Sequence, residues 1–148
     1  FFIMRSMNNH LDFDLDLASE QSEKNPVYYI QYAYARISNI IRRHKESYPK
    51  EDDFFDPSLI ISDEEINILK HLVNFPEVIE YAYQNLEPQF IANFLQELAS
   101  YFHKFYNKCR VITADPDLTK ARINLIKSVK IILGNGLTIL GITMPERM

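Results

Sequence analysis

Glycine is scarce in this sequence: only Gly134, Gly136 and Gly141 occur among 148 residues. The loops that cradle phosphates, in dinucleotide-binding proteins and in P-loop proteins, need several glycines close together where a strand leads into a helix. The three glycines lie near the carboxyl end and match neither pattern. A nucleotide-binding enzyme is therefore disfavoured for these residues.

Cysteine and long apolar segments are lacking as well. Cys109 is the single cysteine, so no internal disulfide can form and a disulfide-framed secreted module is disfavoured. No apolar run approaches the roughly 18 residues that cross a bilayer, and the first residues lack the order of a signal peptide. We therefore expect a cytoplasmic protein with no membrane partner. Because the sequence opens with Phe1 rather than Met, we also expect a piece of a longer chain.

The composition, with 47% hydrophobic and 24% charged residues, is typical of one folded domain. A chain of this length buries roughly 68–70% of the surface that it exposes when unfolded, so it needs neither metal nor disulfide. None of the four histidines follows a glutamate by three positions, the spacing that places both ligands of a carboxylate-bridged metal site on one helix face. We expect no metal site and no catalytic constellation.

The net charge of -4 conceals an uneven distribution of charge. Residues 26–50 hold five Lys and Arg against one Glu, and residues 98–132 hold seven against two acidic residues, whereas residues 51–97 hold eleven acidic residues and one Lys. If the two basic blocks meet in the fold, they form a positive face that suits a polyanion. The alternative is that each block is an ordinary solvated helix face.

Helical spacing of apolar residues dominates the chain after residue 25. Helix-start signals occur at Asn25-Pro26, at the capping box of residues 62–65, at Pro88 and at Asp115-Pro116. They predict helices over residues 26–44, 62–75, 76–85, 88–109 and from 116 towards Gly134, with a loop over residues 48–61. Residues 11–17 alternate apolar and acidic side chains, which predicts a strand. The fold expected is an all-α bundle of about five helices after a short strand-like segment.

Two of the predicted helices carry the same ladder at a spacing of four, formed by Tyr28, Tyr32 and Arg36 and by Phe102, Tyr106 and Arg110. Residues four apart lie along one side of a helix. Aromatic rings interleaved with guanidinium groups suit unpaired bases, because every base offers a π-face. Both ladders lie in the basic blocks, so they predict a site for single-stranded nucleic acid. The alternative is that a second layer of structure simply buries the tyrosines.

The sequence resembles the C-terminal anticodon-binding domain of arginyl-tRNA synthetases, often named the DALR domain. The resemblance covers essentially the whole chain and is carried by residues 2–6, 11–17, 25–36 (NPVYYIQYAYAR), 102–111, 134–137 and 145–148 (PERM). Most members have histidine where this chain has Tyr34. The resemblance implies that residues 1–24 are the tail of a catalytic domain or a connecting segment, and that residues 25–148 form the helical anticodon-binding domain.

The resemblance also implies a function. The chain would bind the anticodon stem and loop of tRNA(Arg) and position it for ATP-dependent arginylation by a catalytic domain that precedes Phe1. Neither an HIGH-like nor a KMSK-like tetrapeptide occurs in these residues, so we expect no catalysis and no cofactor here. ATP and arginine would bind the catalytic domain, which would be a partner within the same chain. We expect a monomer with no affinity for DNA.

Carried over position by position, the resemblance places the anticodon-loop contacts on Tyr32, Arg36, Tyr106, Arg110 and Met148. The first four are rungs of the two ladders, which the spacing identified independently. Met148 depends on the resemblance alone, since terminal residues are usually frayed. Some relatives have an aromatic residue in place of Arg110, so stacking and hydrogen bonding both stay open there. The rival function is a helical protein-interaction module that docks through its acidic middle, residues 51–97.

Overall fold

The computed structural model describes residues 15–22, 24–48 and 54–148 of the chain. The described residues are helical and contain no strand, which confirms the predicted all-α class. In chain order, the helices are α1 (Leu15–Ser19), α2 (Pro26–Ser47), the 3-10 helix η2 (Pro57–Leu59), α3 (Asp63–Leu72), α4 (Phe75–Asn85), α5 (Gln89–Lys108) and α6 (Pro116–Ile139).

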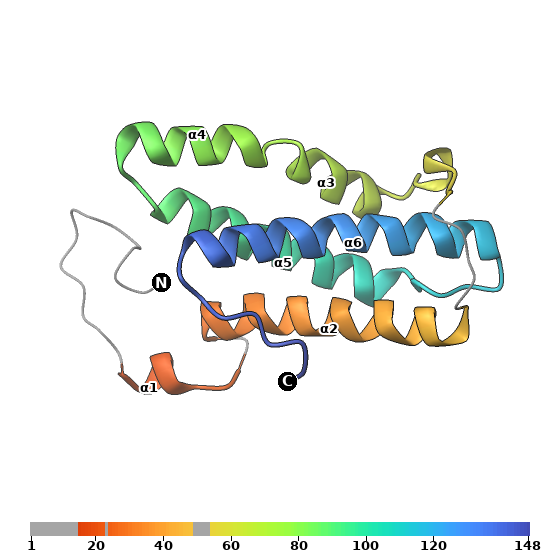
Figure 1. The fold of residues 1–148 in the computed structure, drawn as a ribbon, viewed down its shortest axis with the longest axis horizontal. Coiled ribbons are helices and arrows are strands. Elements are labelled where there is room, and N and C mark those ends of the chain that lie inside the picture. Colours follow the sequence, from red (N-terminus) through yellow and green to blue (C-terminus); the bar gives the residue numbers. More distant parts are fainter. Residues whose placement is uncertain (1–14, 23, 49–53) are drawn as a thin grey trace.

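Helix α5 is the centre of the bundle and contacts α2, α3, α4 and α6. In Figure 1, α3 and α4 lie along one side of the pair formed by α5 and α6, and α2 lies along the other side. The residues after α6 turn back and run across α2. This arrangement brings α2 beside α5, so the two helices that carry the predicted ladders are neighbours.

The helices begin where local capping signals predict. The Asn25 side chain accepts hydrogen bonds from the first backbone N–H groups of α2, and Asp115 does the same for α6. Ser62 and Glu65 form a reciprocal capping box at the start of α3. These side chains satisfy N–H groups that have no partner inside a helix, which is why they mark helix starts in the sequence. At its other end, α2 runs to Ser47, slightly beyond the predicted end.

The strand predicted for residues 11–17 is wrong wherever the structure describes it. Residues 15–17 belong to α1, and residues 11–14 lie outside the described residues. Alternating apolar and acidic residues fit a strand only if a second strand pairs with it, because a single strand leaves its backbone groups unpaired. The described part of the chain offers no such strand, whereas a helix pairs its own backbone. The domain boundary between residues 24 and 25 stays a prediction.

The core is built around the apolar stripe of α5. Apolar residues recur at helical spacing along this helix, as in the predicted helix over residues 88–109, and Leu95, Leu98, Phe102 and Phe105 are all fully buried. Other fully buried side chains come from α2, α3 and α6, namely Ile30, Ile37, Ile68, Ile126, Val129, Leu133 and Leu137. A continuous core of this kind fixes the rotation of α2 and α5 about their axes, and with it the direction of the residues on their shared flank.

Gly136 lies inside α6 rather than after it, at the point where α6 crosses α5. A Cβ atom at this position would come 2.5 Å from Leu95 Cδ2, well inside van der Waals contact. Glycine therefore allows the two helices to approach closely, and this need outweighs the poor helix propensity of glycine.

Gly136→Ala is expected to lower the free energy of unfolding by about 1–3 kcal/mol, because overpacking outweighs the gain in helix propensity. Gly134→Ala is the matched control two residues earlier, where the nearest atoms to a new Cβ lie at 3.4 Å. This control should be neutral or stabilising by up to about 1 kcal/mol. Urea unfolding of both variants tests the contrast, and equal stability of the two would refute the packing role of Gly136.

Candidate nucleic-acid interface

The ladder on α2 forms a stacked column. The rings of Tyr28 and Tyr32 are nearly parallel, with centroids 6.2 Å apart and an interplanar angle of 7°. The guanidinium carbon of Arg36 lies 4.7 Å from the Tyr32 centroid, and Arg36 Nη2 donates a hydrogen bond of 2.6 Å to Tyr32 Oη. The spacing of four residues therefore produces direct contact between successive side chains, as expected for one helix face.

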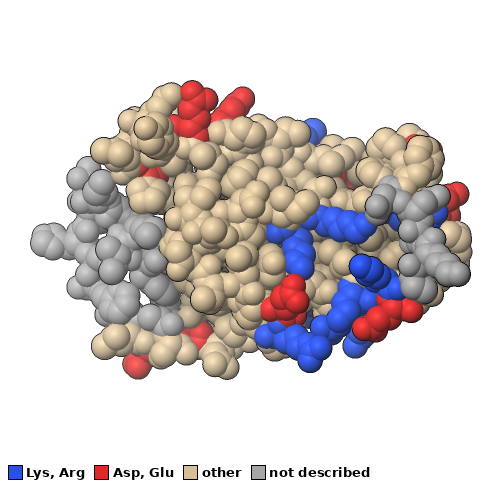
Figure 2. All heavy atoms as spheres, viewed as in Figure 1, with Lys and Arg blue, Asp and Glu red and all other residues tan. Residues whose placement is uncertain are grey.

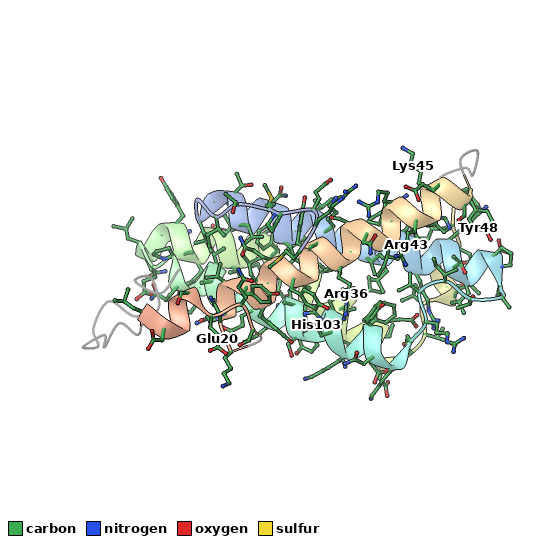
Figure 3. The ribbon with its side chains drawn as sticks, turned by 90° about the horizontal axis from the view of Figure 1, so that it is seen from below. Glu20, Arg36, Arg43, Lys45, Tyr48 and His103 are labelled. Carbon is green, nitrogen blue, oxygen red and sulfur yellow. The ribbon has the colours of Figure 1, made fainter. Side chains whose placement is uncertain are left out.

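Helix α5 adds Tyr106 to this column. The Arg36 guanidinium carbon lies 4.5 Å from the Tyr106 centroid, so the cation contacts one ring from α2 and one from α5. In Figure 3, Arg36 and His103 lie between these two helices. The His103 ring is roughly parallel to Tyr32, with centroids 5.9 Å apart. The structure thus brings the two ladders together through a cation–π sandwich, an interaction of about 2 kcal/mol when desolvated.

The tyrosine rings are less accessible to a ligand than the ladder pattern alone indicates. Tyr32 is half-buried and contacts Tyr28, Arg36 and His103, whereas Tyr106 keeps 36% of its surface exposed. Tyr106 is therefore the better placed of the two predicted tyrosines for stacking on a base. Tyr32 is better placed to hold Arg36, through its hydroxyl group and its ring.

A groove of about 520 Å³ opens beside this sandwich. It is lined by four of the five predicted site residues, Tyr32, Arg36, Tyr106 and Met148. Residues of α2, α5 and the carboxyl-terminal segment therefore meet at one surface.

The fifth predicted residue, Arg110, lies next to this groove. It lines an adjoining pocket of about 330 Å³, whose apolar wall includes Val111 and Ile112. The pocket and the groove share Arg43, Tyr106 and Ile40. The structure therefore places all five predicted residues along one continuous surface, with Arg110 at its edge.

Met148 reaches the groove because the segment after α6 is held against the bundle. Gln31 Nε2 donates a hydrogen bond of 2.9 Å to the Thr143 carbonyl oxygen, and Lys130 Nζ lies 3.2 Å from Glu146 Oε1. These contacts tie the segment to α2 and to α6. Met148 itself is 51% exposed and belongs to the lining of the groove.

The groove is cationic, although the protein as a whole is acidic. Arg42, Arg43 and Arg147 line it together with Arg36. Figure 2 shows Lys and Arg gathered over the carboxyl-terminal half of α2 and the neighbouring part of α6, with a few acidic side chains among them. Three cations of the basic block at residues 26–50, namely Arg36, Arg42 and Arg43, thus lie at the surface that the ladders form.

Part of the second basic block serves another purpose. Lys108 pairs with Glu64, and Arg122 pairs with Glu65 at 2.6 Å, so two cations of this block are paired with carboxylates of the acidic segment. The hydrogen bond from Lys108 lowers the pKa of Glu64 and raises the pKa of Lys108. The two basic blocks therefore meet only in part.

The described residues offer neither a metal site nor a helix that could cross a membrane. Within residues 15–22, 24–48 and 54–148, no group of three or more His, Cys, Asp or Glu side chains is arranged to hold a metal ion. In the same ranges, no helix has the length and apolar character needed to cross a membrane.

Comparison with known proteins decides the family. Residues 30–148 match the family described as the DALR anticodon binding domain. The chain belongs to this family. The resemblance to the DALR domain and the all-α fold expected from the sequence are therefore confirmed. The DALR domain described here has α2, α5 and the carboxyl-terminal segment at its candidate interface.

Relatives of this DALR domain are named as ligases. The whole chain is 48% identical to part of the arginine–tRNA ligase of Carboxydothermus hydrogenoformans and 50% identical to part of the same-named protein of Geotalea daltonii. It spans only 27% of the length of each relative.

Solved structures agree with the fold of the DALR domain. An arginyl-tRNA synthetase of Campylobacter jejuni superposes with a TM-score of 0.82 and 25% identity, over 99% of this chain and 32% of that one. The Thermus thermophilus arginyl-tRNA synthetase gives a TM-score of 0.80 and 29% identity, over 95% of this chain and 24% of that one.

Sequence reasoning missed several residues of the DALR domain that lie at the interface. Arg43 lies seven residues after Arg36, so the same helical face continues past the end of the ladder. His103 precedes Tyr106 by three residues, a spacing that places both on one face of α5. Both positions were therefore recognisable from spacing. Arg147 offered no such signal, because its position depends on the path of the carboxyl-terminal segment.

Proposed function

We propose that this DALR domain binds the anticodon stem and loop of tRNA(Arg) as part of a longer arginine–tRNA ligase that acts in the cytoplasm. The names of its relatives support the ligase, and the family supports an anticodon loop as the partner. One structural observation supports the proposed RNA contact most directly. Arg36 lies between tyrosines from two helices, beside a groove with three further arginines.

Binding divides between phosphates and bases. Arg42, Arg43 and Arg147 contact phosphates of the loop, which fixes the position of the RNA without reading its sequence. Tyr106 stacks on an unpaired base, and the planar fork of Arg36 offers hydrogen-bond donors to a base edge. Bases of an anticodon loop are unpaired, so their faces and edges are open to such contacts.

No bond is made or broken at this interface. ATP and arginine bind the catalytic domain of the longer ligase, and the DALR domain contributes by orientation. Holding the anticodon end fixes the direction of the whole tRNA, so its acceptor end reaches the active site more often in a productive geometry. Met148 and Arg110 extend the contact on two sides of the groove.

Tyr106→Ala should weaken binding of tRNA(Arg) by about 1–3 kcal/mol, because it removes the ring that stacks on a base. Tyr32→Ala should weaken binding as well, because Arg36 loses the ring and the hydroxyl group that hold it. Tyr83→Ala is the control, since Tyr83 is 79% exposed and lies on α4, which does not line the groove. Filter binding with the full-length protein measures all three affinities. Unchanged affinity of both groove variants would refute the stacking role.

The rival function, docking of a protein through acidic residues 51–97, stays a prediction. Two carboxylates of this segment, Glu64 and Glu65, already pair with cations of α5 and α6. A pull-down with the full-length protein separates the two functions. Recovery of tRNA supports the proposed function, and recovery of a protein without tRNA supports the rival.

A further inference from the structure

Arg110 emerges from backbone that is not helical. Helix α5 ends at Lys108, Cys109 is extended with φ -114° and ψ 128°, and α6 begins only at Pro116. A side chain on a connecting segment is positioned only as well as its backbone is held. What holds the carbonyl group of Arg110 therefore matters for the edge of the groove.

Arg122 of α6 holds it. Arg122 Nη1 donates a hydrogen bond of 2.7 Å to the Arg110 carbonyl oxygen. Its Nε donates a second hydrogen bond of 2.6 Å to Glu65 Oε1. The side chain of Arg122 is 13% exposed and does not line the groove or the adjoining pocket. Its contact with Arg110 is thus made outside the groove and the adjoining pocket.

Glu65 fixes the direction of Arg122 in turn. Glu65 is fully buried, and its second oxygen accepts hydrogen bonds from the backbone N–H groups of Ser62 at 2.8 Å and Ile61 at 3.2 Å. Both carboxylate oxygens are therefore engaged. Because the guanidinium group is planar and rigid, a fixed Nε also fixes the direction of Nη1. The start of α3, α6 and the Arg110 backbone thus form one connected unit.

We propose that Arg122 is a positioning residue for RNA binding, which sets Arg110 at the edge of the groove without contacting the RNA. This inference rests on the proposed function. A lysine at position 122 keeps a positive charge beside Glu65, but its single ammonium group lacks the fork that serves Glu65 and the Arg110 carbonyl in fixed directions. Arg122→Lys therefore preserves most of the ion pair and disturbs the positioning.

The test is a double-mutant cycle in the full-length protein, with tRNA(Arg) as the probe. Arg122→Lys should weaken binding by about two- to tenfold, the effect of one hydrogen bond. In an Arg110→Ala background, the same change should alter affinity less than about twofold, because no positioned side chain is left to lose. Lys70→Met, at an exposed position on α3, is the control for general effects. Thermal unfolding of every variant confirms that it is folded at the temperature of the binding measurement.

The other possible results distinguish failure of the positioning role of Arg122 from failure of the proposed function. An equal loss from Arg122→Lys in both backgrounds, or no loss in either, overturns the positioning role. If Arg110→Ala leaves binding unchanged while Arg36→Ala weakens it, the positioning role fails and the proposed function stands. If neither Arg110→Ala nor Arg36→Ala weakens binding, the proposed function fails as well.

Discussion

Replacing Arg122 with methionine is expected to lower the free energy of unfolding by about 3–5 kcal/mol, the cost of breaking a buried ion pair from one side. Methionine fills much of the volume of arginine but leaves the Glu65 carboxylate buried without its cation. The Arg110 carbonyl also loses a donor. Since a domain of this size is stable by only about 5–15 kcal/mol, this change removes a large part of its stability.

Chemical unfolding of Arg122→Met measures the loss directly. Lys70→Met removes a cation at an exposed position, and its effect should stay within about 0.5 kcal/mol. Glu65 and Arg122 lie 57 residues apart in the sequence, so a large effect reports a tertiary contact between α3 and α6. A loss below about 1 kcal/mol for Arg122→Met would show that the pair is dispensable.

Phe102→Ala is expected to cost about 3–5 kcal/mol of stability and also to weaken RNA binding. Phe102 is fully buried, and its ring lies beneath two rings of the interface, with centroids 6.0 Å from Tyr106 and 5.5 Å from His103. Truncating it leaves a cavity under the interface as well as in the core. Tyr106 then loses the surface that keeps it against Arg36.

Phe105→Ala separates the two effects. Phe105 is equally buried on the same helix, so it should lose a similar amount of stability. It does not line the groove, and its truncation should leave the affinity for tRNA(Arg) within about twofold at a temperature where both variants are folded. Equal losses of affinity in the two variants would contradict a specific support by Phe102.

The buried pair also predicts how stability depends on pH. Burial raises the pKa of Glu65, but hydrogen bonds from the Ser62 backbone and from Arg122 outweigh this effect, so the pKa lies below its ordinary value of 4.5. A carboxyl with a lowered pKa stabilises the fold above its unfolded value, and this stabilisation is lost as the pH falls through the folded value. Urea unfolding from neutral pH to acid should therefore show a fall in stability below pH 4.5. Glu65→Gln should flatten this fall, whereas Glu77→Gln, at an exposed position, should leave it unchanged.

Local features were the ones that could be predicted from sequence. Asn25, Ser62 and Asp115 cap the helices that follow them through contacts within three residues, so a short stretch of sequence contains the whole interaction. The apolar stripe of α5 was equally readable, because helical periodicity determines which side chains share a face. The alternation in residues 11–17 misled, since a strand depends on a partner elsewhere in the chain.

The interface could be predicted only in part, for a related reason. Spacing places Tyr32 beside Arg36, but the contact of Arg36 with Tyr106 depends on how α2 and α5 rotate to fill the core. The pairing of Glu65 with Arg122 had no sequence signal, because each is one charged residue among many. The family resemblance supplied Met148, whose place depends on a segment that lies across two helices.

The position of the groove determines at which stage of folding it can form. Its walls come from α2, near the start of the bundle, and from residues that follow α6, so two segments far apart in the sequence must come together before it exists. Closing so long a loop is entropically costly, and contacts between distant segments tend to form late. Under the proposed function, a chain that is still incomplete or locally opened at α2 would bind RNA more weakly, and bound RNA would in turn stabilise the closed state. The affinity for RNA would thus report whether the chain is completely folded.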